Sequence, residues 1–382
     1  MGAAAVKPSI AVSKLLRERR AEHKLTLRAV SDRLAERGER IPVSTLARIE
    51  QGKLDPGVRR LHMLLELYRV PPHLVADLVE LELIAEVPPV EGDLETLYAN
   101  GVAAWKRGDF PTGLACFFAI RKQVPADEES KLVRQRATLG FSIAARNLGK
   151  FRLAKQMVDD LLCEPPSDSL LINVLVEASS LWRGLGSFET ALALVRQAAT
   201  HLDPGNSPES AWIRHQEARL LLEDGKLADA ERLLDAAIEH YRTQSDPYGE
   251  AKALNLRTGL LRKSGDPVAA LATAGKALQL AEEHQMESVR LGAQLEMGQL
   301  QVETGKVEEG LRMLSEGLGE AVRLGNRRGE FLAHYYLWKT HEKLDDTDRA
   351  RFELQAARYF VRFIDDHSPE ADEVRRLLDG GS

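Results

Sequence analysis

The sequence is poor in cysteine and in aromatic residues, and it has no long apolar run. Among 382 residues there are two cysteines, Cys116 and Cys163, and Phe, Trp and Tyr together make up 5%. Two thiols this far apart are too few for a disulfide framework and lack the spacing of a metal site. The N-terminal stretch has no apolar core of a secretory signal, and no stretch approaches the ~18 apolar residues of a membrane helix. We therefore expect a protein of the reducing cytoplasm.

Motifs for catalysis and for cofactor binding are also missing. The ten histidines form no His-Glu-x-x-His pair. Gly317 and Gly319 lie in a helical pattern and do not follow a strand, so they do not form a nucleotide-binding loop. Asp365 and Asp366, next to His367, fit a solvated helix end better than an acid and base pair. We expect no enzyme activity, no cofactor and no metal.

Helix-forming residues dominate the chain, and its charges are unevenly divided. The absence of strand-type alternation predicts an all-α fold, and 382 residues are enough for more than one domain. Residues 1–72 hold 15 Lys or Arg against 8 Asp or Glu, a net charge of +7, which leaves −13 for the remainder of a chain of net charge −6. A basic head on an acidic body indicates that the head meets a polyanion.

Two short amphipathic segments within residues 25–52 define the basic head. Val30 and Leu34 share one face of the first segment, and Leu46 and Ile49 share one face of the second. Helices this short bury little surface alone. They need apolar helices on both sides, which the sequence predicts at about residues 13–23 and 58–68.

Capping and glycine residues mark the ends of both segments. Thr26 can cap the first helix, Gly38 ends it, and Gly52 ends the second. Together with the ST-L-x-R-I-E-x-G run at residues 44–52, this pattern resembles the lambda repressor and Cro class of helix-turn-helix domains, the XRE family. The resemblance covers residues 13–72 and implies a five-helix DNA-binding domain, preceded by a flexible tail over residues 1–12.

The resemblance also implies how the head would contact DNA. The second helix would begin near Pro42 or Val43 and lie in the major groove, with Arg48 as its only long bidentate donor. Most of the affinity would then come from phosphate contacts. The base-edge candidates are Val43, Ser44, Thr45, Ala47 and Arg48, and the phosphate candidates are Lys14, Arg28, Arg37, Arg40, Lys53 and Arg59. The alternative is a small protein-binding domain whose charges are only solvated.

A connecting helix and linker are expected over residues 73–92, and beyond them the chain repeats itself. Each copy has a Gly, or Asp in the last copy, and a small residue five positions later that begins an apolar run. The copies start at Gly108, Gly149, Gly186, Gly225, Gly265, Gly305 and Asp345, which are 41, 37, 39, 40, 40 and 40 residues apart. The glycine would end one helix in the left-handed conformation, and the small residue would let two helices pack closely.

Helical hairpins of this kind cannot cover their apolar faces alone and must stack on their neighbours. Over residues 93–379 the pattern resembles tetratricopeptide repeats, although each unit is longer than theirs. The resemblance implies a right-handed α-solenoid of about seven hairpins. Such a solenoid is typical of a recognition surface.

The resemblance to tetratricopeptide arrays places the first helix of each hairpin on the concave side. The positions that would line it carry more Lys and Arg than Glu, although the domain is acidic. We expect this side to bind an extended peptide or another anionic molecule, while solvated side chains of a wide groove are the alternative for any single residue. The candidate ligand residues are Arg146, Asn173, Arg183, Trp212, His215, Arg219, Asn255 and Arg262, and the same positions include Trp105, Lys106 and Lys252.

A helix-turn-helix head followed by a tetratricopeptide body is similar in architecture to the RRNPP group of peptide-sensing quorum regulators of bacteria. That similarity implies a homodimer that binds double-stranded DNA and responds to a peptide. We therefore expect a cytoplasmic transcriptional regulator that has no membrane partner and senses a peptide, a small anionic ligand or a partner protein. The rival hypothesis is a repeat scaffold that assembles proteins and carries a degenerate head.

Overall fold

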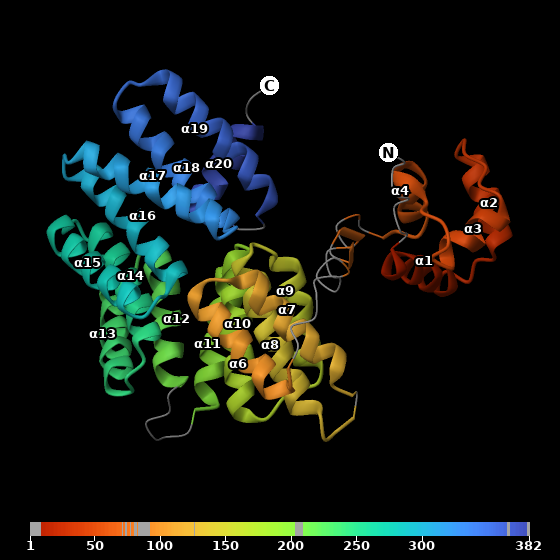
Figure 1. Ribbon diagram of the computed structural model, residues 1–382, viewed down its shortest axis with the longest axis horizontal. Coiled ribbons are helices and arrows are strands. Elements are labelled where there is room, and N and C mark those ends of the chain that lie inside the picture. The colour runs from red at the N-terminus through yellow and green to blue at the C-terminus, as the bar shows by residue number, and fades with distance from the viewer. Residues whose placement is uncertain are drawn as a thin grey trace. The chain divides into compact units, whose positions relative to one another are not determined.

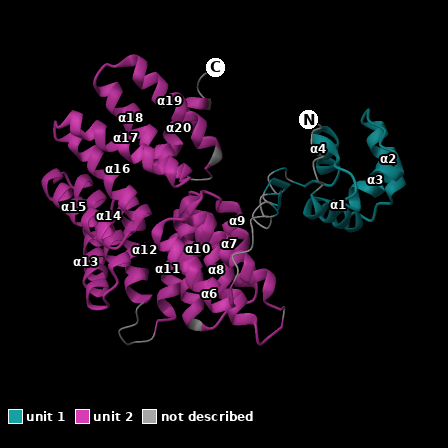
Figure 2. Cartoon of the chain, viewed as in Figure 1, with its two compact units in different colours: residues 1–89 teal, residues 90–382 magenta. Residues whose placement is uncertain are grey.

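The computed structural model describes residues 9–70, 72, 75–76, 78–79, 82, 92–125, 127–202, 209–364 and 367–379. No described residue lies in a strand, so the predicted all-α fold is confirmed. The chain divides into two compact units, residues 1–89 and 90–382 (Figure 2). Most of the predicted tail and linker, and the Asp365-Asp366 pair, lie outside the described residues. None of the helices described is long and apolar enough to cross a membrane.

The first unit begins with a helix-turn-helix arrangement between two flanking helices. Its helices are α1 (Ile10–Glu22), α2 (Leu27–Glu36), α3 (Val43–Glu50) and α4 (Gly57–Leu67) (Figure 1). Helix α1 starts three residues earlier than expected because the side chain of Ser9 accepts a hydrogen bond from the Val12 amide, and Val12 is buried in the core. The described residues of 72–82 are helical too, and Val75 packs into the same core.

The predicted ends of the two central helices are confirmed. The Thr26 side chain accepts from the Ala29 amide at the start of α2, and Pro42 immediately precedes α3. Gly38 and Gly52 have φ of 90° and 67°, which few side chains tolerate. The chain between the two helices is longer than a minimal turn, and Ile41 anchors it because its side chain is 1% exposed.

The second unit stacks seven helical hairpins over the part of the chain that the structure describes. They are followed by a single turn of 3-10 helix, η1 (Val361–Phe363), and by α20 (Pro369–Asp379). The hairpins are α6 (Leu94–Arg107) with α7 (Phe110–Gln123), α8 (Lys131–Asn147) with α9 (Phe151–Cys163), α10 (Asp168–Gly184) with α11 (Phe188–Thr200), α12 (Glu209–Glu223) with α13 (Leu227–Thr243), α14 (Pro247–Lys263) with α15 (Pro267–Glu283), α16 (Glu287–Glu303) with α17 (Val307–Arg323), and α18 (Arg327–Lys343) with α19 (Thr347–Phe360).

The repeated glycine turns have the predicted geometry. The six glycines have φ between 78° and 89°, and Asp345 takes the same left-handed conformation at 57°. The small residue five positions later is buried in every hairpin, as Ala191 illustrates at 0% exposure. A Cβ added to Gly310 would lie 2.6 Å from the carbonyl oxygen of Gly298. The two helices of that hairpin therefore pack at a distance that only glycine allows.

The second unit also brings distant repeats into contact. The ring of Trp105, from α6, meets the ring of Tyr248, from α14, with centroids 5.4 Å apart. The amide of His367 donates to the carbonyl of Gly184, at the end of α10, at 2.8 Å. Contacts between segments this far apart in the chain mean that the solenoid curves tightly enough to enclose space.

Candidate functional site

The apolar face of α3 is fixed in the core of the first unit, so its other face is held outward. Leu46 and Ile49 are 2% and 1% exposed. The turn before the helix is held by the buried Ser31 hydroxyl, which donates to the carbonyl of Ile41 at 2.6 Å. At the other end of the helix, Arg20 of α1 donates two hydrogen bonds to the Glu50 carboxylate, at 2.7 and 2.8 Å. The helix is thus pinned at both ends.

Most of the residues predicted to touch DNA are exposed. Val43, Ser44 and Arg48 of α3 are exposed, while Thr45 and Ala47 are half-buried. Pro42 provides no side-chain cap, so within the described residues the amides of Val43 and Ser44 remain available for a partner, whereas the Thr45 amide donates to the carbonyl of Pro42 at 2.9 Å. The predicted phosphate contacts Lys14, Arg28, Arg37, Arg40, Lys53 and Arg59 are exposed as well.

Acidic residues neutralise only part of this basic surface. Arg59 lies 2.9 Å from Glu39, and Lys14 lies 3.8 Å from Glu18. Among the described residues, the other predicted cations have no acidic side chain within ion-pair distance, and they are Arg28, Arg37, Arg40, Arg48 and Lys53. A surface that carries uncompensated positive charge around an exposed helix suits a polyanion.

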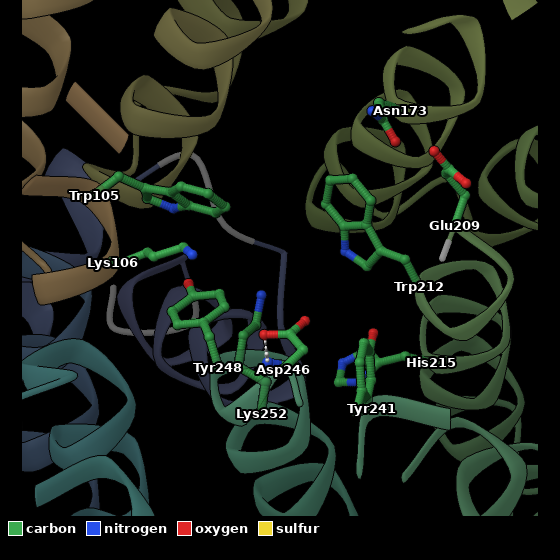
Figure 3. A pocket seen from close by; sticks show the side chains of 11 residues that line it. Trp105, Lys106, Asn173, Glu209, Trp212, His215, Tyr241, Asp246, Tyr248 and Lys252 are labelled. Carbon is green, nitrogen blue, oxygen red and sulfur yellow. Dashed lines mark hydrogen bonds between the residues drawn. The ribbon is translucent and has the colours of Figure 1, made fainter. Parts of the chain in front are cut away.

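In the second unit a cavity of about 290 Å³ lies between the first hairpin and the third, fourth and fifth hairpins (Figure 3). Its lining side chains come from α6, α10, α12, α13 and α14. They are Trp105, Lys106, Asn173, Glu209, Trp212, His215, Tyr241, Asp246, Tyr248, Gly249 and Lys252. The part of the chain that the structure describes contains no group of three His, Cys, Asp or Glu that could hold a metal ion.

Aromatic rings form much of the cavity wall. Trp105 and Trp212 lie on opposite sides of the cavity in Figure 3. Trp105 meets Tyr248 edge to face, and His215 meets Tyr241 in the same manner at 6.4 Å between ring centroids. Four large rings around one small space are unusual in a chain with 5% aromatic residues. Such a wall favours a flat, apolar group.

The polar side of the cavity carries both signs of charge, because Lys106 and Lys252 line it together with Glu209 and Asp246. Burial, strengthened by the positive charges of Arg219 and Arg146, lowers the pKa of Lys252 to about 7. Burial and the charge of Arg183 lower the pKa of Arg219 to about 9. The carboxylates of Glu177 and Asp246 act on Lys252 in the opposite direction but do not restore its usual pKa. Adding an anion here would relieve the repulsion between these cations.

His215 presents a donor without an acceptor. Its Nε2 lies 3.3 Å from Nη2 of Arg219, and a guanidinium only donates, so Nε2 must be the accepting nitrogen. The proton of the neutral ring is therefore on Nδ1, which is buried and has no hydrogen-bond partner among the described residues. Burial and the charges of Arg219 and Lys252 keep the ring neutral, because they lower the pKa of His215 far below its ordinary value.

A smaller space of about 40 Å³ adjoins this cavity and holds paired charges. Arg146 donates to Glu177 at 2.9 Å, and Arg183 donates to Glu223 at 3.0 Å. Arg219 also lines this space. Unlike the first two arginines, Arg219 has no carboxylate within ion-pair distance among the described residues.

The structure brings six of the eight predicted ligand residues together. Asn173, Trp212 and His215 line the larger cavity, while Arg146, Arg183 and Arg219 line the smaller one, to which Trp212 and His215 also belong. Asn255 and Arg262 line neither cavity. Asn255 donates to the carbonyl of Val289 at 3.1 Å, and Arg262 lies 3.6 Å from Glu303.

Five residues that line the cavity were not among the predicted positions, and two of them, Glu209 and Gly249, lie in the first turns of α12 and α14. Tyr241 lies at the end of a second helix, and Asp246 and Tyr248 lie at the start of α14, so counting back from the turn glycines passes over them. A signal was present, because two tyrosines fall within eight residues of an aromatic-poor chain.

Comparisons with known proteins agree with the two-part architecture. Residues 11–78 match the family model of a helix-turn-helix domain. No curated protein matches the chain. Among solved structures, a Rap protein complexed with Competence and Sporulation Factor is 12% identical, with a TM-score of 0.59 over 75% of this chain and 79% of that chain.

Two further solved structures are similar. A STAND protein with a tetratricopeptide repeat sensor from Pyrococcus horikoshii is 17% identical, with a TM-score of 0.50 over 88% of this chain and 60% of that chain. PlcR of Bacillus thuringiensis, in complex with the peptide PapR7 and DNA, is 14% identical, with a TM-score of 0.46 over 74% of this chain and 99% of that chain. The chain therefore joins a helix-turn-helix domain to TPR-like repeats, as the sequence predicted.

Proposed function

We propose that the chain is a DNA-binding transcriptional regulator whose repeat unit senses an anionic ligand, a peptide or a partner protein. The observation that carries the proposal is helix α3. It belongs to a helix-turn-helix domain and projects Val43, Ser44 and Arg48 to solvent among basic side chains without acidic partners.

In this proposal α3 enters the major groove. Arg48 donates to a guanine edge, Val43 and Ala47 contact thymine methyl groups, and Ser44 and Thr45 bond to bases or phosphates. Arg28, Arg37, Arg40 and Lys53 contact phosphates directly. Arg59 and Lys14 exchange Glu39 and Glu18 for phosphate, so their contribution is smaller.

The cavity of the second unit is the proposed sensor site. The similar Rap structure is a complex with Competence and Sporulation Factor, which is consistent with a TPR-like solenoid that recognises a ligand. A ligand that binds one arrangement of the repeats more tightly than another shifts the population between them. Through that shift it changes the affinity of the head for DNA.

We further propose that two chains act as a dimer. Two heads of a dimer read a two-fold related pair of half-sites about one helical turn apart, or a multiple of that spacing. Sedimentation of the full chain at micromolar concentration tests this proposal. The measured mass should be twice the mass of one chain.

Selection of binding sites from a random DNA library tests the DNA-binding proposal. The full chain should enrich one motif, and the Arg48→Ala variant should enrich a less defined one. Absence of any enriched motif, with and without cell extract as a source of ligand, would contradict the proposal. It would favour a protein scaffold instead.

A further inference from the structure

We infer that the cavity lined by Trp105, Trp212 and Lys252 takes a compact aromatic carboxylate, and not an extended peptide. The inference rests on the proposed function, because it names the chemical class of the ligand that the repeat unit senses. The observations that support it are the size of the cavity, its aromatic wall and the unmatched donors on its polar side.

The size of the cavity favours a small molecule. Its volume of about 290 Å³ is at the lower end of the range of small-molecule pockets, about 300–1,000 Å³. Its walls come from the first hairpin and from the third, fourth and fifth hairpins, and the contact between Trp105 and Tyr248 joins the first hairpin to the fifth. An extended peptide needs an open groove along several repeats, whereas this contact interrupts such a groove.

The aromatic wall selects a flat group. Trp105 and Trp212 stand on opposite sides of the space, and Tyr241 and Tyr248 complete the wall (Figure 3). A ring placed between them gains stacking and edge contacts in addition to the burial of its apolar area. A purely aliphatic chain gains only the burial.

The polar side selects a carboxylate. Nζ of Lys252 lies 5.2 Å from the centre of the Tyr248 ring and has no carboxylate within ion-pair distance among the described residues. His215 is 3% exposed, and its Nδ1 has no partner in the described part of the chain. A carboxylate has two oxygens and accepts from both donors at once.

The neighbouring charges explain why the anion is needed. Arg146 and Arg183 already have carboxylates, but Arg219 and Lys252, whose charges act on each other, have none within ion-pair distance in the described part of the chain. Leaving two half-buried cations unpaired is unfavourable, and a bound anion lowers that cost. A ligand that lacks the charge leaves the cost in place.

Calorimetric titration of the full chain tests the inference with a pair of nearly isosteric probes. Indole-3-acetate should bind with one site per chain, and indole-3-acetamide should bind about tenfold more weakly because it lacks the charge. Lys252→Met should abolish the preference for the acid. Lys276→Met is the matched control, because Lys276 is an exposed lysine of α15, outside the cavity, and should leave the preference unchanged.

Two further measurements keep the outcome unambiguous. Trp212→Phe should weaken the binding of indole-3-acetate while circular dichroism shows that the variant is folded. The tripeptide Ala-Ala-Trp, whose carboxylate ends a peptide, should bind more weakly than indole-3-acetate.

Equal binding of the acid and the amide, or no binding of either, would overturn the inference, and so would tighter binding of Ala-Ala-Trp. Selective DNA binding measured on the same preparation separates this failure from failure of the proposed function. If the probes do not bind but DNA binding is selective, only the ligand class is wrong.

Discussion

Trp105, in the first hairpin, packs edge to face against Tyr248, at the start of the fifth hairpin, with ring centroids 5.4 Å apart and an angle of 62° between the rings. This contact lies in the wall of the cavity. It means that the proposed ligand site depends on repeats that are distant in the chain. In the proposal, a ligand bound there touches both residues of that contact and so stabilises one curvature of the solenoid.

Binding of indole-3-acetate should weaken as the pH rises. The free protein has a Lys252 pKa of about 7, and a bound anion raises that pKa, so binding takes up a proton near neutral pH. Affinity is highest below the free pKa and falls above it, by about tenfold between pH 7 and 9. Calorimetry in buffers of different ionisation enthalpy measures the proton uptake.

The groups around Lys252 do not reverse this trend. Arg219, with its pKa of about 9, loses charge in the same direction, and His215 stays neutral because its pKa is lowered. Burial raises the pKa of Tyr248, so that side chain also stays neutral. The other charged groups around the cavity are Lys106, Arg146, Glu177, Glu209 and Asp246. In Lys252→Met most of the pH dependence should disappear, and an unchanged dependence would mean that another group titrates.

Glu50→Gln should destabilise the first unit selectively. The Arg20–Glu50 pair is mostly buried, with side-chain exposures of 21% and 9%, and removing one partner leaves a buried charge. The free energy of unfolding of the first unit should fall by about 3 kcal/mol. Urea unfolding followed by circular dichroism should show an earlier transition of the first unit. Tryptophan emission should not change, because all four tryptophans lie in the second unit.

Glu18→Gln is the control for that experiment. Lys14 and Glu18 form an exposed ion pair at 3.8 Å. Loss of this pair should lower the free energy of unfolding by less than about 0.5 kcal/mol. Similar effects of the two substitutions would show that the Arg20–Glu50 pair does not hold α1 against α3.

Gly184→Ala should destabilise the second unit. A Cβ at this position would lie 2.0 Å from Cε1 of Phe151, which is 4% exposed and packed. The overpacking should cost about 2 kcal/mol, visible as an earlier transition in tryptophan emission. Gly259→Ala offers the opposite case, because no atom apart from those of its chain neighbours and the backbone of α14 itself lies within 4 Å of the added Cβ. That variant should gain about 0.5 kcal/mol from the lower entropy of its unfolded chain, and a loss in both variants would contradict the packing described.

Arg48→Ala and Lys53→Ala should weaken DNA binding in different ways. Arg48 is the long donor on α3, so its loss should cost about 1–3 kcal/mol on the preferred sequence and reduce discrimination. Lys53 follows α3, and its loss should weaken all sequences by a similar factor and reduce the salt slope by about one. Competition assays with scrambled DNA separate the two effects. If Arg48→Ala retains full discrimination, the proposed register of α3 is wrong.

The local elements of this fold could be predicted from sequence because their signals are local. Thr26, Gly38 and the repeated glycines each act on the one or two helix ends beside them, and the structure places them there. The start of α1 was placed three residues late, because the cap at Ser9 precedes any apolar periodicity. The contribution of this cap to the stability of α1 depends on Val12, which is buried only when the unit is folded.

The candidate ligand site could be predicted only in part. A count along each first helix found Asn173, Trp212 and His215, because position within a repeat fixes the face of a helix. It could not place Trp105 opposite Tyr248, because that contact depends on the curvature accumulated over several repeats. Nor could it show that the Asn255 side chain donates to the carbonyl of Val289, because that hydrogen bond depends on the register between neighbouring hairpins.

Fluorescence anisotropy of the full chain on its own upstream DNA, compared with scrambled DNA across a salt series, tests the central proposal most directly. A regulator that reads bases through α3 and phosphates through the surrounding cations should prefer the upstream DNA, and its affinity should fall steeply as salt increases. Equal and weak binding to both DNAs at every salt concentration, unchanged by cell extract, would contradict it.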